Sequence, residues 1–218
     1  MVNLLANNTK LLIEKYKIIA IIRGIELERL IPTAEALYKG GVRLMEVTFN
    51  QKSSRYIEET SIRIEQLCKY FGEDLCIGAG TVMSIEQVEA AANVGAKYMI
   101  SPNTDTEVIK RALDFNTVSI PGALTPSEIV LAYKAGASFV KLFPAGELGI
   151  KYIKAVCSPI NHIPMLAVGG INEYNLRDFL EAGIKGVGIG SNIVKKSLIE
   201  EGKYDDLTAL ALRYTSQI

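Results

Sequence analysis

The nine residues Ala137–Ala145, which read Ala-Ser-Phe-Val-Lys-Leu-Phe-Pro-Ala, predict a short buried strand with one lysine at its centre. Aromatic and β-branched residues favour a strand, and Pro144 ends it. A lysine in such a strand must be paired, reach a cavity or lose its proton. Burial lowers the pKa of a lysine, and a neutral amine in an apolar pocket is a nucleophile for carbonyl carbon. The alternatives for Lys141 are a solvated edge strand and an ion pair with a buried carboxylate.

Outside this strand the chain repeats one unit, which consists of a helix, a glycine at the helix end, an apolar strand and a polar loop. Residues 18–22 are apolar without alternation, as in a parallel strand that is covered on both faces. Further strands are expected at 44–49, 75–78, 98–101, 118–120, 165–168 and 186–189. An extra helix from about residue 3 to residue 16 precedes the first unit.

The helices between these strands have recognisable starts and ends. Three starts carry capping residues: Ser84 with Gln87, Thr104 with Glu107, and Thr125 with Pro126 and Glu128. Later helices are expected near 149–157, from 172 to Gly183, in a short segment after Ser191, and over 204–217.

Eight such units predict a single (β/α)8 TIM barrel domain over residues 1–218, with an extra N-terminal helix. Parallel strands need crossover connections, and these are right-handed. An open doubly wound sheet is the alternative. The barrel is favoured because the units are even in length and no dinucleotide fingerprint follows the first strand. The fragment Gly78-Ala79-Gly80 does not continue as a glycine-rich loop that opens a helix.

Composition narrows the function classes. The 218 residues carry a formal net charge of zero, which gives no electrostatic footprint for nucleic acid or an anionic membrane. Charged residues within the N-terminal apolar pattern argue against a signal peptide or a membrane span there. The three cysteines have no CxxC spacing, so we expect reduced thiols in a cytoplasmic protein. Because His162 is the only histidine, we expect neither a histidine-cluster metal site nor a Cys/His zinc site. We also expect no cofactor.

In this fold the active site lies at the carboxyl ends of the strands. Glu46 lies inside the apolar second strand, as isolated as Lys141 in the sixth. These strands lie on opposite sides of an eight-stranded barrel, so both side chains can point inward and meet. The alternative is that Glu46 and Lys141 form a structural ion pair, although buried ion pairs stabilise a fold only weakly.

Glycine-rich turns close the last two expected strands, at Gly169-Gly170 and Gly190-Ser191. Loops at these positions commonly bind phosphate through backbone N–H groups. The alternative is that they are only tight turns.

Five further residues at strand ends are candidates for substrate binding, and Asn50, which follows the second strand, is one of them. Arg23 suits a carboxylate, and Thr81 adds a hydroxyl donor. Pro102 and Phe143 could form an apolar wall around a small methyl group. The alternatives are a solvated arginine and a phenylalanine that packs in the core.

The ordered set of motifs resembles the 2-keto-3-deoxy-6-phosphogluconate (KDPG) / 4-hydroxy-2-oxoglutarate (KHG) aldolase family. The matching segments are 40–48, 77–82, 100–103, 121–128, 140–145, 168–171 and 188–191, which cover nearly the whole chain. The resemblance implies a class I, metal-independent aldolase that works as a homotrimeric barrel. It also implies a Schiff base on Lys141, acid/base chemistry by Glu46, a pyruvate pocket with Thr81, Pro102 and Phe143, and phosphate loops with Gly169, Gly170 and Ser191.

The chain departs from one form of the family pattern. Some members have an arginine in the loop after the second strand, where this chain has Asn50, whereas others resemble this chain in having the arginine at the position of Arg23. A related branch that acts on the galactonate epimer also has this second arrangement. This departure leaves the substrate epimer open but not the type of reaction. The expected activity is KDPG cleavage, and KHG is a further candidate substrate. The alternatives are cleavage of the galactonate-derived phosphate, a sugar-phosphate isomerase or epimerase, and a sugar-phosphate binding protein.

Overall fold

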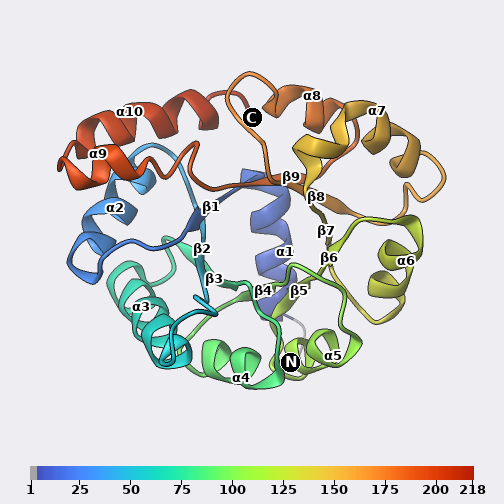
Figure 1. The fold of residues 1–218 in the computed structure, drawn as a ribbon, viewed down its shortest axis with the longest axis horizontal. Coiled ribbons are helices and arrows are strands. Elements are labelled where there is room, and N and C mark those ends of the chain that lie inside the picture. Colours follow the sequence, from blue (N-terminus) through green and yellow to red (C-terminus); the bar gives the residue numbers. More distant parts are fainter. Residues whose placement is uncertain (1–3) are drawn as a thin grey trace.

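Nine short strands form the centre of residues 4–218, the part of the chain that our computed structural model describes (Figure 1). They are β1 (Ile18–Ile22), β2 (Leu44–Thr48), β3 (Cys76–Gly80), β4 (Tyr98–Ile100), β5 (Val118–Ile120), β6 (Gly122–Ala123), β7 (Val140–Leu142), β8 (Met165–Val168) and β9 (Gly186–Ile189). Their order is β5-β4-β3-β2-β1-β9-β8-β7-β6, and the paired neighbours are parallel. The predicted (β/α)8 barrel is confirmed.

The ninth strand arises because the expected fifth strand is divided at Pro121. β5 pairs with β4 before the proline, and β6 pairs with β7 after it. Proline has no N–H to donate to a ladder, but the carbonyl of Pro121 accepts a hydrogen bond of 2.8 Å from the N–H of Lys141. Together with a 3.0 Å bond from Ser138 N–H to the Ser119 carbonyl, this contact joins the two ends of the sheet.

Helices surround the barrel on the outside, as Figure 1 shows. They are α2 (Leu27–Lys39), α3 (Tyr56–Phe71), α4 (Ile85–Asn93), α5 (Thr106–Asp114), α6 (Pro126–Lys134), α7 (Ala145–Cys157), α8 (Leu176–Glu181), α9 (Lys196–Glu200) and α10 (Tyr204–Thr215). Their apolar faces and the outward side chains of the strands form one large buried cluster. This packing buries both faces of the sheet, as the apolar strands predicted.

The N-terminal helix α1 (Leu4–Tyr16) lies across one end of the barrel. Ile13 of this helix packs in a buried cluster with Leu44 and Tyr98, which are the first residues of β2 and β4. The amino end of the barrel is therefore filled with apolar side chains, and the carboxyl ends of the strands are left for a site. The helix was predicted from about residue 3, and that first position lies outside the described residues.

Local details of the helix starts differ from the predictions in part. The capping box of Thr125 and Glu128 is confirmed. Ser84 also caps its helix, but the Gln87 side chain accepts from Met83 N–H rather than from Ser84 N–H. The predicted box of Thr104 and Glu107 is wrong, because Asp105 accepts from the N–H of Glu107 at 2.9 Å while Thr104 donates to the Gly122 carbonyl.

Two helix boundaries also move. α7 begins at Ala145 instead of 149, with a break at Gly149, whose φ is 74°. α8 begins at Leu176 instead of 172, because the side chain of Asn172 accepts from the N–H groups of Tyr174 and Asn175 and forms a turn there. Among the described residues, no helix has the length and apolar character needed to span a membrane.

Candidate active site

A cavity of about 470 Å³ opens at the carboxyl ends of the strands. Of the site residues expected from the sequence, it is lined by Arg23, Glu46, Thr81, Pro102, Lys141, Phe143, Gly169, Gly170, Gly190 and Ser191. These residues lie on or directly after β1, β2, β3, β4, β7, β8 and β9, so only the folded barrel brings them together. Residues 4–218 contain no cluster of three or more potential His, Cys, Asp or Glu metal ligands.

Lys141 lies at the middle of β7 with only 7% of its surface exposed. Its ammonium nitrogen is 4.8 Å from the ring centroid of Phe143, so the ring covers one side of the amine. Burial lowers the pKa of Lys141, the nearby charge of Glu46 opposes this change, and the charge of Arg23 adds to it. The amine is therefore more easily deprotonated than a lysine in water.

Glu46 lies on β2, and three strands, β1, β9 and β8, separate it from β7 around the ring. Its exposed fraction is 2%, and its carboxylate atom Oε2 has no hydrogen-bond partner among the described residues. Burial raises the pKa of Glu46, while the charges of Lys141 and Arg23 lower it by smaller amounts. A buried carboxylate oxygen without a partner is costly, and it can bind a hydroxyl group or a water from the cavity.

Two glycines of β3 make room for the groups around this carboxylate. A Cβ atom on Gly80 would lie 1.6 Å from Glu46 Oε1, and one on Gly78 would lie 2.1 Å from the ring of Tyr98. The Tyr98 hydroxyl donates a 2.7 Å hydrogen bond to the carbonyl of Met45, next to Glu46. The segment 78–80 therefore serves packing around the site.

Thr81 follows β3 with a backbone φ of 57°, a region that β-branched residues rarely adopt. Its carbonyl accepts a 3.0 Å hydrogen bond from the side-chain amide of Gln51, in the loop after β2. Strained backbone of this kind costs free energy and clusters at functional sites. The strain thus distinguishes Thr81 from the other loop residues of the cavity.

The loop after β8 exposes backbone N–H groups. Gly169 and Gly170 have φ values of 90° and 75°, which glycine adopts readily. Their carbonyls accept hydrogen bonds from Gly146 N–H at 2.8 Å and from the Asn175 side chain at 3.0 Å. In a trans peptide the next N–H points opposite to the carbonyl, so the N–H groups of residues 170 and 171 face away from these donors.

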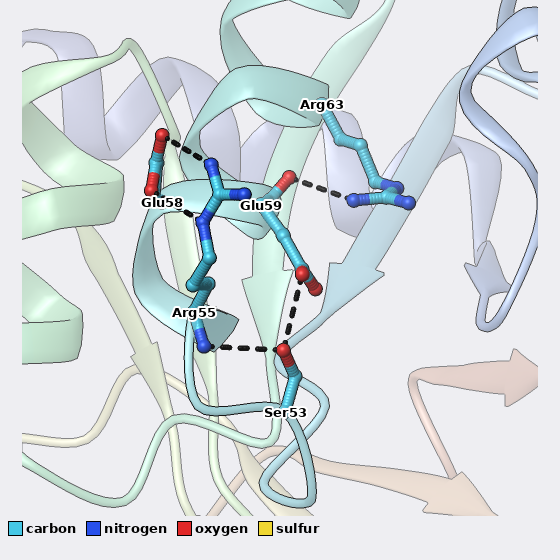
Figure 2. A network of polar contacts seen from close by, with 5 residues as sticks. All are labelled: Ser53, Arg55, Glu58, Glu59 and Arg63. Atoms are coloured by element: carbon cyan, nitrogen blue, oxygen red, sulfur yellow. Dashed lines mark hydrogen bonds and ion pairs between the residues drawn. The ribbon is translucent and has the colours of Figure 1, made fainter.

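Asn50 lies outside the lining of this cavity. It is exposed in the loop after β2, and its side chain accepts a 3.3 Å hydrogen bond from the N–H of Lys52. The same loop continues into an exposed polar network, in which Ser53 bonds Glu59 and Arg55 forms two bonds with Glu58 (Figure 2). This placement gives the predicted substrate-binding role of Asn50 no support.

Two polar residues of the lining were missed from the sequence. Asn192 donates a 2.7 Å hydrogen bond to the carbonyl of Ile171 and so connects the loops after β9 and β8. Lys196 begins α9 at the rim of the cavity. The sequence shows two lysines, Lys195 and Lys196, shortly after Gly190-Ser191. Only the turn at residues 190–194 decides that Lys196 lines this cavity.

Comparison with known proteins identifies relatives along nearly the whole chain. The family described as KDPG and KHG aldolase matches residues 10–210. A 2-dehydro-3-deoxy-6-phosphogalactonate aldolase from Escherichia coli is 32% identical over 94% of this chain and 97% of its own length. A 2-dehydro-3-deoxy-phosphogluconate aldolase from Haemophilus influenzae is 33% identical over 93% of this chain and 94% of its own length.

A solved structure with a covalently bound small molecule shows the same fold. It is the KDPG aldolase from Legionella pneumophila with pyruvate captured as a covalent carbinolamine, and it is 30% identical to this chain. The two chains superpose with a TM-score of 0.83 over 94% of this chain and 97% of the other. The chain described here therefore belongs to the KDPG and KHG aldolase family and is a carbon–carbon lyase.

Proposed function

We propose that this chain is a class I aldolase that cleaves KDPG to pyruvate and glyceraldehyde 3-phosphate through a Schiff base on Lys141. The observation that carries the proposal is that two buried groups line one cavity. They are the Lys141 amine, whose pKa is lowered, and the Glu46 carboxylate, whose Oε2 has no hydrogen-bond partner among the described residues. The covalent pyruvate carbinolamine in the Legionella pneumophila relative supports the same chemistry.

Lys141 forms the covalent intermediate. Its neutral amine attacks the C2 carbonyl of the substrate, and loss of water from the carbinolamine leaves an iminium ion. The lowered pKa of Lys141 favours this step because only the neutral amine is nucleophilic. The iminium then accepts the electron pair of the C3–C4 bond.

Glu46 moves the protons. Its ionised form, directly or through a water, takes the proton of the C4 hydroxyl while the C3–C4 bond breaks and glyceraldehyde 3-phosphate leaves. The protonated carboxyl then returns a proton to C3 of the enamine, and water hydrolyses the iminium to pyruvate and free Lys141. A carboxyl whose pKa is raised by burial suits both roles.

The remaining cavity residues bind the substrate. Arg23 and Thr81 hold the carboxylate, with Arg23 close enough for its charge to act on Glu46 and Lys141. Pro102 and Phe143 form the apolar wall beside C3. The loops at 169–171 and 190–191 receive the phosphate, with backbone N–H groups as donors.

The galactonate-derived phosphate is the second candidate substrate. The observation that favours it is the arrangement of Arg23 in the cavity and Asn50 outside it, together with the 32% identical relative named 2-dehydro-3-deoxy-6-phosphogalactonate aldolase. KHG, which would yield pyruvate and glyoxylate, is a third substrate to test. A lyase assay that compares kcat/KM for these three compounds ranks them.

Borohydride trapping tests the Schiff base. Incubation with pyruvate and sodium borohydride should add one reduced pyruvyl group to the intact protein, located on Lys141 by peptide mass spectrometry. The Lys141→Ala variant should gain no mass. An unmodified wild-type protein, or an adduct that survives Lys141→Ala, would favour a non-covalent isomerase or a binding protein instead.

We also propose that the enzyme is a homotrimer, as the family resemblance implies. Exposed apolar side chains on and next to α4 and α6 support an interface there, and these are Met83, Ile85, Leu124, Leu131 and Tyr133. Sedimentation velocity should give the mass of three chains, and Leu131→Glu should lower it. A monomeric wild-type protein would contradict this proposal.

A further inference from the structure

Lys196 is a cation at the rim of the active-site cavity with no role in the chemistry described above. It is the first residue of α9 and lines the cavity together with Gly170 and Ser191. Its ammonium group lies 3.6 Å from a carboxylate oxygen of Glu200, and the two side chains are 67% and 59% exposed. Exposed pairs of this kind hold a lysine only weakly.

The loops that receive the phosphate offer only neutral groups. The residues at 169–171 and 190–191 supply backbone N–H groups and one hydroxyl, whereas a phosphate ester carries nearly two negative charges at neutral pH. Among the described residues, the cavity is lined by three cations, Arg23, Lys141 and Lys196. Arg23 and Lys141 act at the end of the substrate that carries the keto acid group, and the charge of Arg23 changes the pKa of both Glu46 and Lys141.

The backbone at Lys196 is fixed relative to these loops. The N–H groups of Ile193 and Val194 donate to the carbonyl of Gly190 at 3.0 and 2.9 Å, which forms a tight turn after β9. Asn192 ties this turn to the Ile171 carbonyl of the other loop. The start of α9 therefore stays beside both loops while the long lysine side chain remains free to move.

We propose that Lys196 is a specificity-determining residue whose ammonium group leaves Glu200 and binds the phosphate of the substrate. This inference rests on the proposed aldolase function and extends it. A dianionic phosphate is a stronger partner than a single exposed carboxylate, because charge-assisted hydrogen bonds to it add to the bonds from the loops. Lys196 thus makes the enzyme select phosphorylated over unphosphorylated keto acids.

Lys195 provides a matched control. It is adjacent in the chain and carries the same charge, but it lines a different cavity of about 530 Å³ beside α10, with Asp206 and Arg213. A general effect of surface charge on an anionic substrate would be similar for both lysines. An effect of phosphate contact would be confined to Lys196.

The experiment compares Lys196→Met and Lys195→Met in steady-state assays with KDPG and with unphosphorylated 2-keto-3-deoxygluconate. Lys196→Met should raise KM for KDPG about tenfold or more with little change in kcat, because it removes one charge-assisted hydrogen bond. The same variant should weaken inhibition by inorganic phosphate by a similar factor and leave kcat/KM for the unphosphorylated substrate unchanged. Lys195→Met should behave as wild type in each assay.

Equal losses on both substrates, or equal effects of the two lysine variants, would overturn the role of Lys196. Failure of the aldolase proposal has a different signature, since the wild-type protein would then cleave neither substrate and form no pyruvate adduct. Calorimetric titration with inorganic phosphate covers that case, because Lys196→Met should weaken phosphate binding whatever the reaction. Unchanged phosphate affinity in this titration would also count against the inference.

Discussion

Glu46 occupies the space directly beside Gly80, where a Cβ atom would lie 1.6 Å from the carboxylate oxygen Oε1. In the register of β2 and β3, Glu46 is opposite Gly78, and Gly80 is two residues further toward the carboxyl end. The glutamate side chain therefore leans along the barrel toward the cavity. It reaches the cavity because position 80 has no side chain.

Gly80→Ala should displace this carboxylate and reduce kcat by about a hundredfold or more, since general acid–base catalysis contributes about 10²–10⁴. Lys141 is on the opposite side of the ring, so trapping of pyruvate by borohydride should still occur. The measurement is kcat with KDPG, and a circular dichroism melt controls for folding. Wild-type turnover in a folded Gly80→Ala protein would show that this packing does not position Glu46.

Glu46→Gln separates proton transfer from covalent catalysis. The amide cannot take or return the proton, so kcat should fall by about 10²–10⁴. The pyruvate adduct on Lys141 should still form, because attack on C2 uses the lysine amine. Rapid trapping followed by intact mass spectrometry measures the adduct in the same samples as the kinetic assay. An active Glu46→Gln enzyme would assign the acid/base role to another group.

Lys141→Met should abolish activity and raise the free energy of unfolding at neutral pH, because burial disfavours the charged form of Lys141 and methionine is an apolar side chain of similar size. The pKa of Lys141 is lowered in the folded state, so the unfolded chain binds more protons as pH falls below the ordinary lysine pKa of about 10.4. The stability of the wild type therefore rises with pH over this window.

The difference in the free energy of unfolding between wild type and Lys141→Met should consequently be largest at neutral pH and disappear above about pH 10. Urea unfolding of wild type and Lys141→Met at several pH values measures it. Lys195→Met, in which an exposed lysine is replaced, serves as the control and should stay close to wild type. A difference in the free energy of unfolding that increases toward alkaline pH would contradict the lowered pKa of Lys141.

Arg23→Met should move the acid limb of pyruvate adduct formation to higher pH. The charge of Arg23 lowers the pKa of Lys141, so its removal raises that pKa and less amine is neutral at a given pH. The rate of adduct formation, followed by cyanoborohydride trapping between about pH 5 and 9 around the expected limb, measures the change. Lys52→Met, which removes an exposed charge in a neighbouring loop, should leave the limb in place. A shift to lower pH would contradict the assignment.

Much of the barrel was predictable because its units are local. Apolar strands, glycines at helix ends and the capping box of Thr125 and Glu128 depend on residues a few positions apart, and the structure confirms them. The wrong capping box at Thr104 shows the limit of such reasoning. The Thr104 hydroxyl donates to the carbonyl of Gly122, which lies after the next strand. The helix is therefore capped by the side chain of Asp105.

The two central site residues are recognisable in the sequence for a physical reason. A lone charge in an apolar strand is too costly to occur without a purpose, and Glu46 and Lys141 are the only charged residues in the described strands. Loop residues carry no such signal, because polar side chains are ordinary in loops. The prediction therefore included Asn50 although it faces solvent, and it omitted Lys196 although that residue lines the cavity.

The amino-acid sequence by itself determined the order of strands and helices, the (β/α)8 class and the two buried charges, since each follows from local pattern and from the cost of burying charge. Only the tertiary structure decided where Pro121 divides a strand, how Gly80 admits the Glu46 carboxylate, and which of two adjacent lysines lines the cavity at the carboxyl ends of the strands. These features depend on contacts between segments far apart in the chain, and such contacts exist only once the ring has closed.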